Sequence, residues 1–180
     1  MGLRSVVRTV ECPAEVSQRL KRMTTILDKL SREPTMQLAN MHDVGGCRVV
    51  VDSVNQLRRV ERRLKKNRPP LRHADYVKSP RSSGYRAVHV VVGYEDEARA
   101  MRAIEVQLRT KVMHEWAIAV ERISGRVRED LKSGRGHNEV LRWFAAVSEA
   151  MAIEEFGGEP PPALLTTITD LRSRAMPYMA

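Results

Sequence analysis

The chain has 180 residues, of which 42% are hydrophobic and 29% charged, and this composition fits one globular domain with a hydrophobic core. A formal net charge of +9 and an isoelectric point near 10.1 favour polyanionic partners: nucleotides, RNA or an acidic protein. No stretch approaches a membrane span, and Cys12 and Cys47 lack metal-ligand spacing, so we expect a reduced, cytoplasmic protein that does not enter a membrane.

The first part of the chain predicts two helices and a strand. Residues 14–32 carry apolar side chains at helical spacing and lie between two prolines, so we expect an amphipathic helix there. Residues 46–51 predict a short buried strand after a glycine pair. Residues 53–67 predict a second helix with Ser53 as its N-cap.

The second part predicts further strands and then helices. Strands are expected at 73–78, 85–92 and 102–109, a loop at 79–84, and helices at 111–123, 138–155 and 163–175. Interleaved helices and strands indicate an α/β (α+β) fold, with a mixed β-sheet flanked by helices and a C-terminal helical tail. We expect a core over 1–125 and a helical extension over 126–180 that packs on it, with a linker near 157–162.

Residues 103–110 alternate apolar and polar side chains, which places Glu105, Gln107 and Arg109 on one face of the expected strand. Asp43 precedes another strand. Two carboxylates on neighbouring strands suit Mg²⁺, which brings substrate phosphates, and one of them could deprotonate an attacking hydroxyl. The alternative, in which each carboxylate pairs with a nearby arginine, stays open.

Two further segments suit a nucleotide. The residues of 14–32 that could grip a triphosphate are Arg19, Lys21, Thr25 and Lys29, although such a charge run is also typical of a solvated helix face. In the loop before the strand at 85–92, Arg81 and an exposed Tyr85 beside a glycine suit base stacking, and Tyr85 shares a face with His89. The alternative for Tyr85 is cross-strand packing.

Four segments in chain order resemble motifs of the RelA/SpoT-type synthetases. They are RLKRMTTILDKL, MHDVGGCRVVV, DYVKSPRSSGYRAVH and IEVQLRTKVMHEWA, and together they cover about residues 16–120. The resemblance implies a nucleotidyltransferase-like fold and the transfer of pyrophosphate from ATP to an acceptor 3′-hydroxyl, with Mg²⁺ as cofactor.

The resemblance also implies a role for each polar side chain. Those that bind the adenine or the phosphates of ATP would be Arg19, Lys21, Thr25, Lys29 and Arg48. Asp43 would bind Mg²⁺, and Glu105 would be its metal partner or the general base. Those around the acceptor, with Tyr85 stacked on its base, would be Lys78, Arg81, Tyr85, His89, Gln107 and Arg109.

The acceptor segment departs from the family pattern, since Arg81, Ser83, Arg86 and Ala87 replace lysine, asparagine, a frequent glutamine and serine. The chain looks most like the toxic small alarmone synthetases, which implies a growth-inhibiting toxin that modifies the 3′ CCA end of tRNA and is neutralised by an antitoxin. The positive charge agrees with tRNA.

Two other functions stay open: synthesis of (p)ppGpp from GDP or GTP, and an inactive nucleotide- or RNA-binding module. The tail from Gly157 onward matches no family motif. It could pack on the core, form homo-oligomers or contact tRNA.

Overall fold

The computed structural model describes residues 2–20, 23–32, 35, 45–95 and 99–179, except for four side chains within 23–32. The chain divides into two compact units. The first unit comprises Met1–Ala74 and Val88–Leu108, and the second comprises Asp75–Ala87 and Arg109–Ala180. These units are defined by tertiary contacts, and their bounds differ from the expected core over 1–125 and extension over 126–180. That expected division stays a prediction.

The first unit is built around a mixed five-stranded sheet with the strand order β1-β2-β5-β4-β3. The strands are β1 (Ala14–Leu20), β2 (Gly45–Val51), β3 (Arg72–Asp75), β4 (Val88–Glu95) and β5 (Met101–Thr110), whose last two residues belong to the second unit. β1 pairs antiparallel with β2, and β4 pairs antiparallel with β5. The expected fold class is therefore confirmed.

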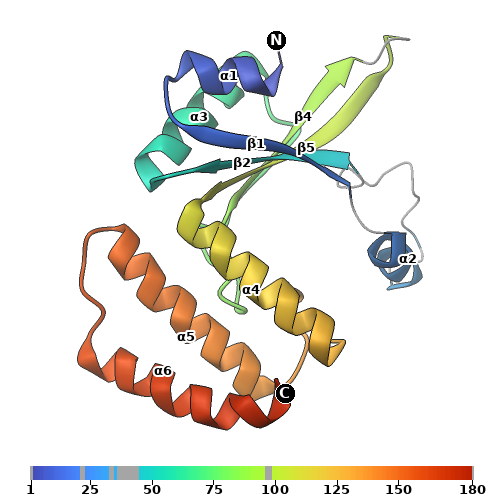
Figure 1. Ribbon diagram of the computed structural model, residues 1–180. Coiled ribbons are helices and arrows are strands. Elements are labelled where there is room, and N and C mark those ends of the chain that lie inside the picture. The colour runs from blue at the N-terminus through green and yellow to red at the C-terminus, as the bar shows by residue number, and fades with distance from the viewer. Residues whose placement is uncertain (1, 21–22, 33–34, 36–44, 96–98, 180) are drawn as a thin grey trace. The chain divides into compact units, whose positions relative to one another are not determined.

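Three helices accompany this sheet: α1 (Leu3–Thr9), α2 (Met23–Arg32) and α3 (Val54–Asn67). α1 and α3 contact each other and lie against β1 and β2 (Figure 1). Ser53 caps α3 as expected, in a capping box with Gln56. Leu57, Val60 and Leu64 of α3 are fully buried, so this helix supplies much of the core of the unit.

The expected helix over 14–32 is wrong in its first half. Residues 14–20 form β1, whose residues pair from Ala14 opposite Val51 to Leu20 opposite Gly45, and only α2 is helical. Pairing with the buried strand β2 satisfies the backbone of this segment, and such tertiary pairing overrides a helical apolar pattern. Arg19 is consequently on a strand.

The second unit is helical. Its elements are α4 (Lys111–Val127), η2 (Leu131–Ser133), α5 (Asn138–Glu155), α6 (Pro162–Ala175) and η3 (Met176–Tyr178). α5 contacts both α4 and α6, and α5 and α6 lie side by side (Figure 1). Residues 156–161 connect these two helices, and α5 has the expected bounds.

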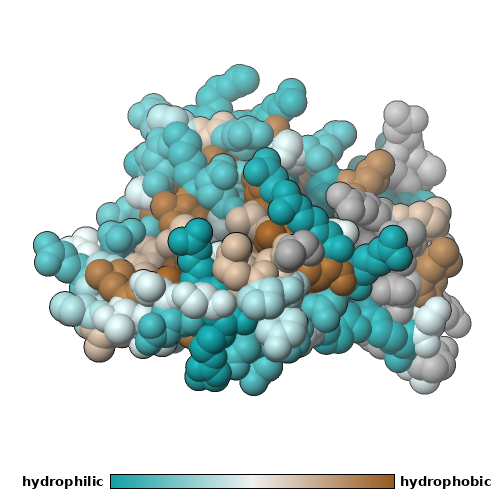
Figure 2. All heavy atoms as spheres, turned by 60° about the horizontal axis from the view of Figure 1, so that its bottom comes forward, coloured by the Kyte–Doolittle hydropathy of each residue, from teal (hydrophilic) through white to brown (hydrophobic). Residues whose placement is uncertain are grey.

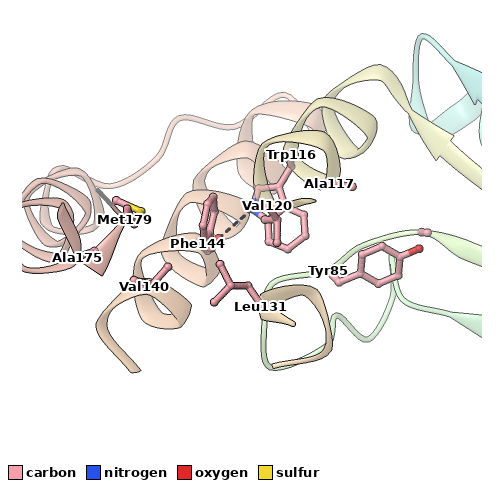
Figure 3. Packing of buried hydrophobic residues seen from close by; sticks show 10 residues of the cluster. Tyr85, Trp116, Ala117, Val120, Leu131, Val140, Phe144, Ala175 and Met179 are labelled. Carbon is pink, nitrogen blue, oxygen red and sulfur yellow. Dashed lines mark hydrogen bonds between the residues drawn. The ribbon is translucent and has the colours of Figure 1, made fainter. Parts of the chain in front are cut away.

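The core of the second unit joins helical side chains to one segment that precedes β4. Figure 3 shows Trp116 and Phe144 packed together, with the indole N–H donating to the Phe144 carbonyl at 3.0 Å. Tyr85 and Ala87 belong to the same buried cluster. They lie before β4, which begins at Val88 and not at the expected residue 85.

The face in Figure 2 is mostly hydrophilic, and its hydrophobic side chains form small separate patches. Among the described residues, no helix combines the length and apolar character needed to cross a bilayer.

Candidate active site

The carboxylate of Glu105 is the centre of a polar cluster in the first unit. Gln107 Nε2 donates to Glu105 Oε1 at 2.6 Å, and His89 Nδ1 lies 3.2 Å from Glu105 Oε2. The β4–β5 register explains the cluster, since His89 lies opposite Gln107 and Glu105 is two residues away on the same face. The side chains of His89 and Glu105 keep 16% and 15% of their surface exposed, so the cluster remains open to a ligand.

This environment holds Glu105 in its charged form. Burial raises the pKa of Glu105, but the hydrogen bond and charge of His89, the amide of Gln107 and the charge of Arg19 lower it more. The net result is a pKa lowered from 4.5 to about 2. A carboxylate that is ionised over the whole physiological range is a good cation ligand and a weak proton acceptor.

A pocket adjoins this carboxylate and is lined by Arg19, Gly46, Cys47, Glu105 and Gln107. Gly46 brings β2 against β5, because a Cβ at this position would lie 2.6 Å from the backbone oxygen of Glu105. Only glycine fits such a close approach of two backbones. Cys47 and Gly46 were not among the expected site residues, although the Gly45-Gly46 pair marks the place in the sequence.

The two arginines expected to hold adenine lie on one face of the β1–β2 ladder. Arg48 is opposite Ser17 and Arg19 is opposite Gly46, so the arginines are diagonal neighbours. Diagonal positions lie about 7–8 Å apart across an antiparallel pair, a spacing that admits one flat ring between two stacked guanidinium groups.

The remaining ATP-side predictions fall at the edge of what the structure describes. Lys21 and Asp43 lie outside the described residues, and Thr25 and Lys29 lie on α2 with side chains that are also outside them. No three metal-ligating side chains gather among the described residues. Mg²⁺ takes one or two carboxylates together with substrate phosphates, and the ionised Glu105 fits that requirement.

The expected exposure of Tyr85 is wrong. Tyr85 is 2% exposed and packs against Tyr76 and Trp116, with ring centroids 5.8 and 6.5 Å away. Arg109 Nη2 donates to its hydroxyl at 2.9 Å, so the polar end of the ring is also satisfied. In Figure 3 this hydroxyl points away from the helical side chains of the cluster. An acceptor role for Tyr85 stays a prediction.

Cations surround Tyr85 in the second unit. The guanidinium of Arg81 lies 5.7 Å from the ring centroid, that of Arg109 lies 5.2 Å away and Lys132 Nζ lies 5.1 Å away. Arg109 is 1% exposed, whereas Arg81 and Lys78 are exposed. Sequence reasoning missed Lys132, which follows no motif and reaches Tyr85 only through the tertiary fold.

Comparison with known proteins identifies the same region. Residues 18–123 match a family model described as a region found in RelA / SpoT proteins. The GTP pyrophosphokinase YjbM of Bacillus subtilis is 29% identical over 128 residues, which cover 65% of this chain and 61% of that protein. The chain thus spans about three fifths of the length of this relative.

Solved structures agree on the fold. The small alarmone synthetase 1 of Bacillus subtilis bound to its product pppGpp matches with a TM-score of 0.72 and 24% identity, over 86% of this chain and 84% of that one. A GTP pyrophosphokinase family protein of Streptococcus pneumoniae matches with a TM-score of 0.68 and 26% identity, over 86% and 82%.

Proposed function

Because the chain belongs to the family of RelA/SpoT proteins, we propose that it is an ATP-dependent pyrophosphokinase whose acceptor is a guanosine nucleotide, GDP or GTP. Relatives found by sequence are named as GTP pyrophosphokinases, which supports this acceptor over tRNA. The observation that carries the proposal is the ionised Glu105 beside a pocket that Arg19 also lines.

The transfer forms one bond and breaks one bond. The acceptor 3′-oxygen attacks the β-phosphorus of ATP, the bond from that phosphorus to the bridging α–β oxygen breaks, and AMP leaves. The hydroxyl proton passes to a base or to water. Since charge builds on the phosphate oxygens, such a transfer depends mainly on positioning and on neutralisation by cations.

The proposed ATP site includes residues inside and outside the part of the chain that the structure describes. Arg19 and Arg48 hold the adenine between their guanidinium groups, in keeping with their diagonal placement on β1 and β2. Lys21, Thr25 and Lys29 bind the phosphates. Glu105 and Asp43 are the residues that would hold Mg²⁺, which supplies neutralising charge. The low pKa of Glu105 favours this role over that of general base.

The acceptor side draws on two groups of residues. In the first unit, His89 and Gln107 orient the Glu105 carboxylate and contact the acceptor near its hydroxyl. In the second unit, the exposed Arg81 and the half-buried Lys132, which lie near the Tyr85 ring, contact the acceptor, and the buried Tyr85 and Arg109 support them. The exposed Lys78 adds positive charge at the edge of this group.

The test is a transfer assay with ATP labelled at the γ-phosphate. The protein is incubated with Mg²⁺ and, in separate reactions, with GDP, GTP or deacylated tRNA, and the products are separated by thin-layer chromatography. We expect label in a guanosine tetra- or pentaphosphate. Label in tRNA alone would show that tRNA is the acceptor in place of GDP and GTP. It would then favour the expectation of a growth-inhibiting toxin with an antitoxin.

Two further outcomes concern the other expectations. A folded protein that binds ATP and labels none of the three acceptors would support an inactive binding module. Sedimentation of the purified chain tests the homo-oligomer, which stays a prediction from the sequence.

A further inference from the structure

The acceptor segment, residues 81–87, rests directly on helix α5. Gly84 has a φ of +86°, and a Cβ there would lie 2.9 Å from both Ala145 Cα and Ser148 Cβ. Both the backbone conformation and the space therefore require glycine. The backbone of the segment is in contact with α5 at this point, with no side chain between them.

A hydroxyl on α5 extends this contact along the segment. Ser148 Oγ donates to the Gly84 carbonyl at 2.6 Å, and Arg86 Nε donates to the same Oγ at 3.2 Å. Ser148 is 3% exposed, so water does not compete for either bond. One buried hydroxyl thus connects the residue before Tyr85 to the residue after it.

A buried ion pair at the C-terminal end of α5 completes the attachment. Arg86 Nη1 lies 2.6 Å from Glu155 Oε2, and their side chains are only 3% and 7% exposed. The two atoms meet as an ion pair without the alignment of a hydrogen bond. The hydroxyl of Thr110 donates to the other oxygen of Glu155. Burying two charges is costly, so this pair is a specific feature of the unit.

These contacts flank Tyr85 and Arg109, two of the side chains that the proposed function places on the acceptor side. Tyr85 lies between Gly84 and Arg86, both of which α5 holds. Arg109, which donates to the Tyr85 hydroxyl, directly precedes Thr110, which is bound to Glu155. The ends of the Tyr85–Arg109 pair are therefore fixed by one helix of the C-terminal region.

We propose that Ser148 and Glu155 of α5, acting through Arg86, are positioning residues for the acceptor nucleotide: they hold the buried Tyr85 and Arg109 in the arrangement that presents the exposed Arg81, next to the Tyr85 ring, to the acceptor. This inference rests on the proposed function. It gives α5 a role in acceptor binding, although Ser148 and Glu155 do not touch the substrate. ATP, whose contacts lie in the first unit, is unaffected.

The experiment compares Glu155→Gln and Ser148→Ala with the wild type in KM for GDP and KM for ATP, and in the Kd for GDP measured by titration calorimetry. We expect KM and Kd for GDP to rise on the order of tenfold in Glu155→Gln, and less in Ser148→Ala, with KM for ATP unchanged. The matched control is Arg174→Gln, which removes the pair between Arg174 of α6 and Glu139 of α5 at 2.7 Å and should change neither constant.

A second variant separates positioning from folding. Arg86→Met with Glu155→Met removes both buried charges and keeps the volume filled, and such replacement of a buried pair is often neutral for stability. We expect melting close to that of the wild type with Kd for GDP still raised. A Kd for GDP equal to that of the wild type in this double variant would overturn the proposal. Arg86 and Glu155 would then only balance each other's charge and would not position the acceptor residues. Where Glu155→Gln does not fold, this comparison decides alone.

The Kd also separates this inference from the proposed function. If the wild type binds GDP without transferring pyrophosphate, the proposed function fails while the Kd of the variants still tests the positioning role. Equal rises in KM for GDP and in KM for ATP would contradict the inference and leave the proposed function in place. A wild type that binds no guanosine nucleotide would overturn both.

Discussion

Two carboxylate clusters, one in each unit, use the same chemistry in different surroundings. Glu105 is held by His89 and Gln107, and its side chain keeps 15% of its surface exposed. Glu155 is held by Arg86 and Thr110, and its side chain keeps 7% exposed beside an arginine at 3%.

This difference in exposure separates a carboxylate that can contact a ligand from one that can only stabilise the fold. The side chain of the first keeps part of its surface exposed, so a cation or a phosphate-bearing ligand can approach it. The second is enclosed and has its full charge balanced inside the protein, so it contributes to geometry and stability. Residue type does not distinguish the two; exposure and the charge of the partner do.

The largest expected effect is that of the substitution Glu105→Gln on the rate of pyrophosphate transfer. We expect the rate of pyrophosphate transfer to fall about 10³-fold, because the amide keeps the shape and loses the charge that faces the reacting phosphates. The matched control is Glu95→Gln at the end of β4, which should retain wild-type rates. Transfer at a normal rate in Glu105→Gln would remove Glu105 from the active site.

The pH dependence of stability tests the charge of Glu105. Because its pKa is lowered from 4.5 to about 2, the charged form stabilises the fold fully above pH 4.5, and this contribution is lost as the pH falls to about 2. We expect the free energy of unfolding of wild type relative to Glu105→Gln to decline by up to about 3 kcal/mol across that window. Urea titrations at several pH values measure it, and a constant difference would argue against an ionised, anchored Glu105.

The smallest effect concerns the backbone contact in the second unit. We expect Gly84→Ala to lower the free energy of unfolding by about 2 kcal/mol, because alanine is strained at this φ and its Cβ meets α5. Gly125→Ala is the matched control, since nothing lies within 4 Å of a Cβ in that helical position and alanine should add about 0.5–1 kcal/mol. Equal changes in the two variants, measured by urea unfolding, would contradict the close packing on α5.

Local sequence patterns were sufficient for several elements. The capping box at Ser53, the alternating strand around Glu105 and the apolar run of α5 each contain their own signal within a few residues. The same is true of the pairing of Glu105 with Gln107, because residues two apart on a strand share a face.

The sequence by itself determined the family, the sheet-and-helix fold class and the polar row on β5, since ordered motifs and strand alternation are local properties. Only the tertiary structure decided that residues 14–20 are a strand and that Tyr85 is buried. It also joined Arg86 to Glu155, 69 positions later in the chain. Strand pairing and burial depend on partners distant in sequence, and no local pattern carries that information.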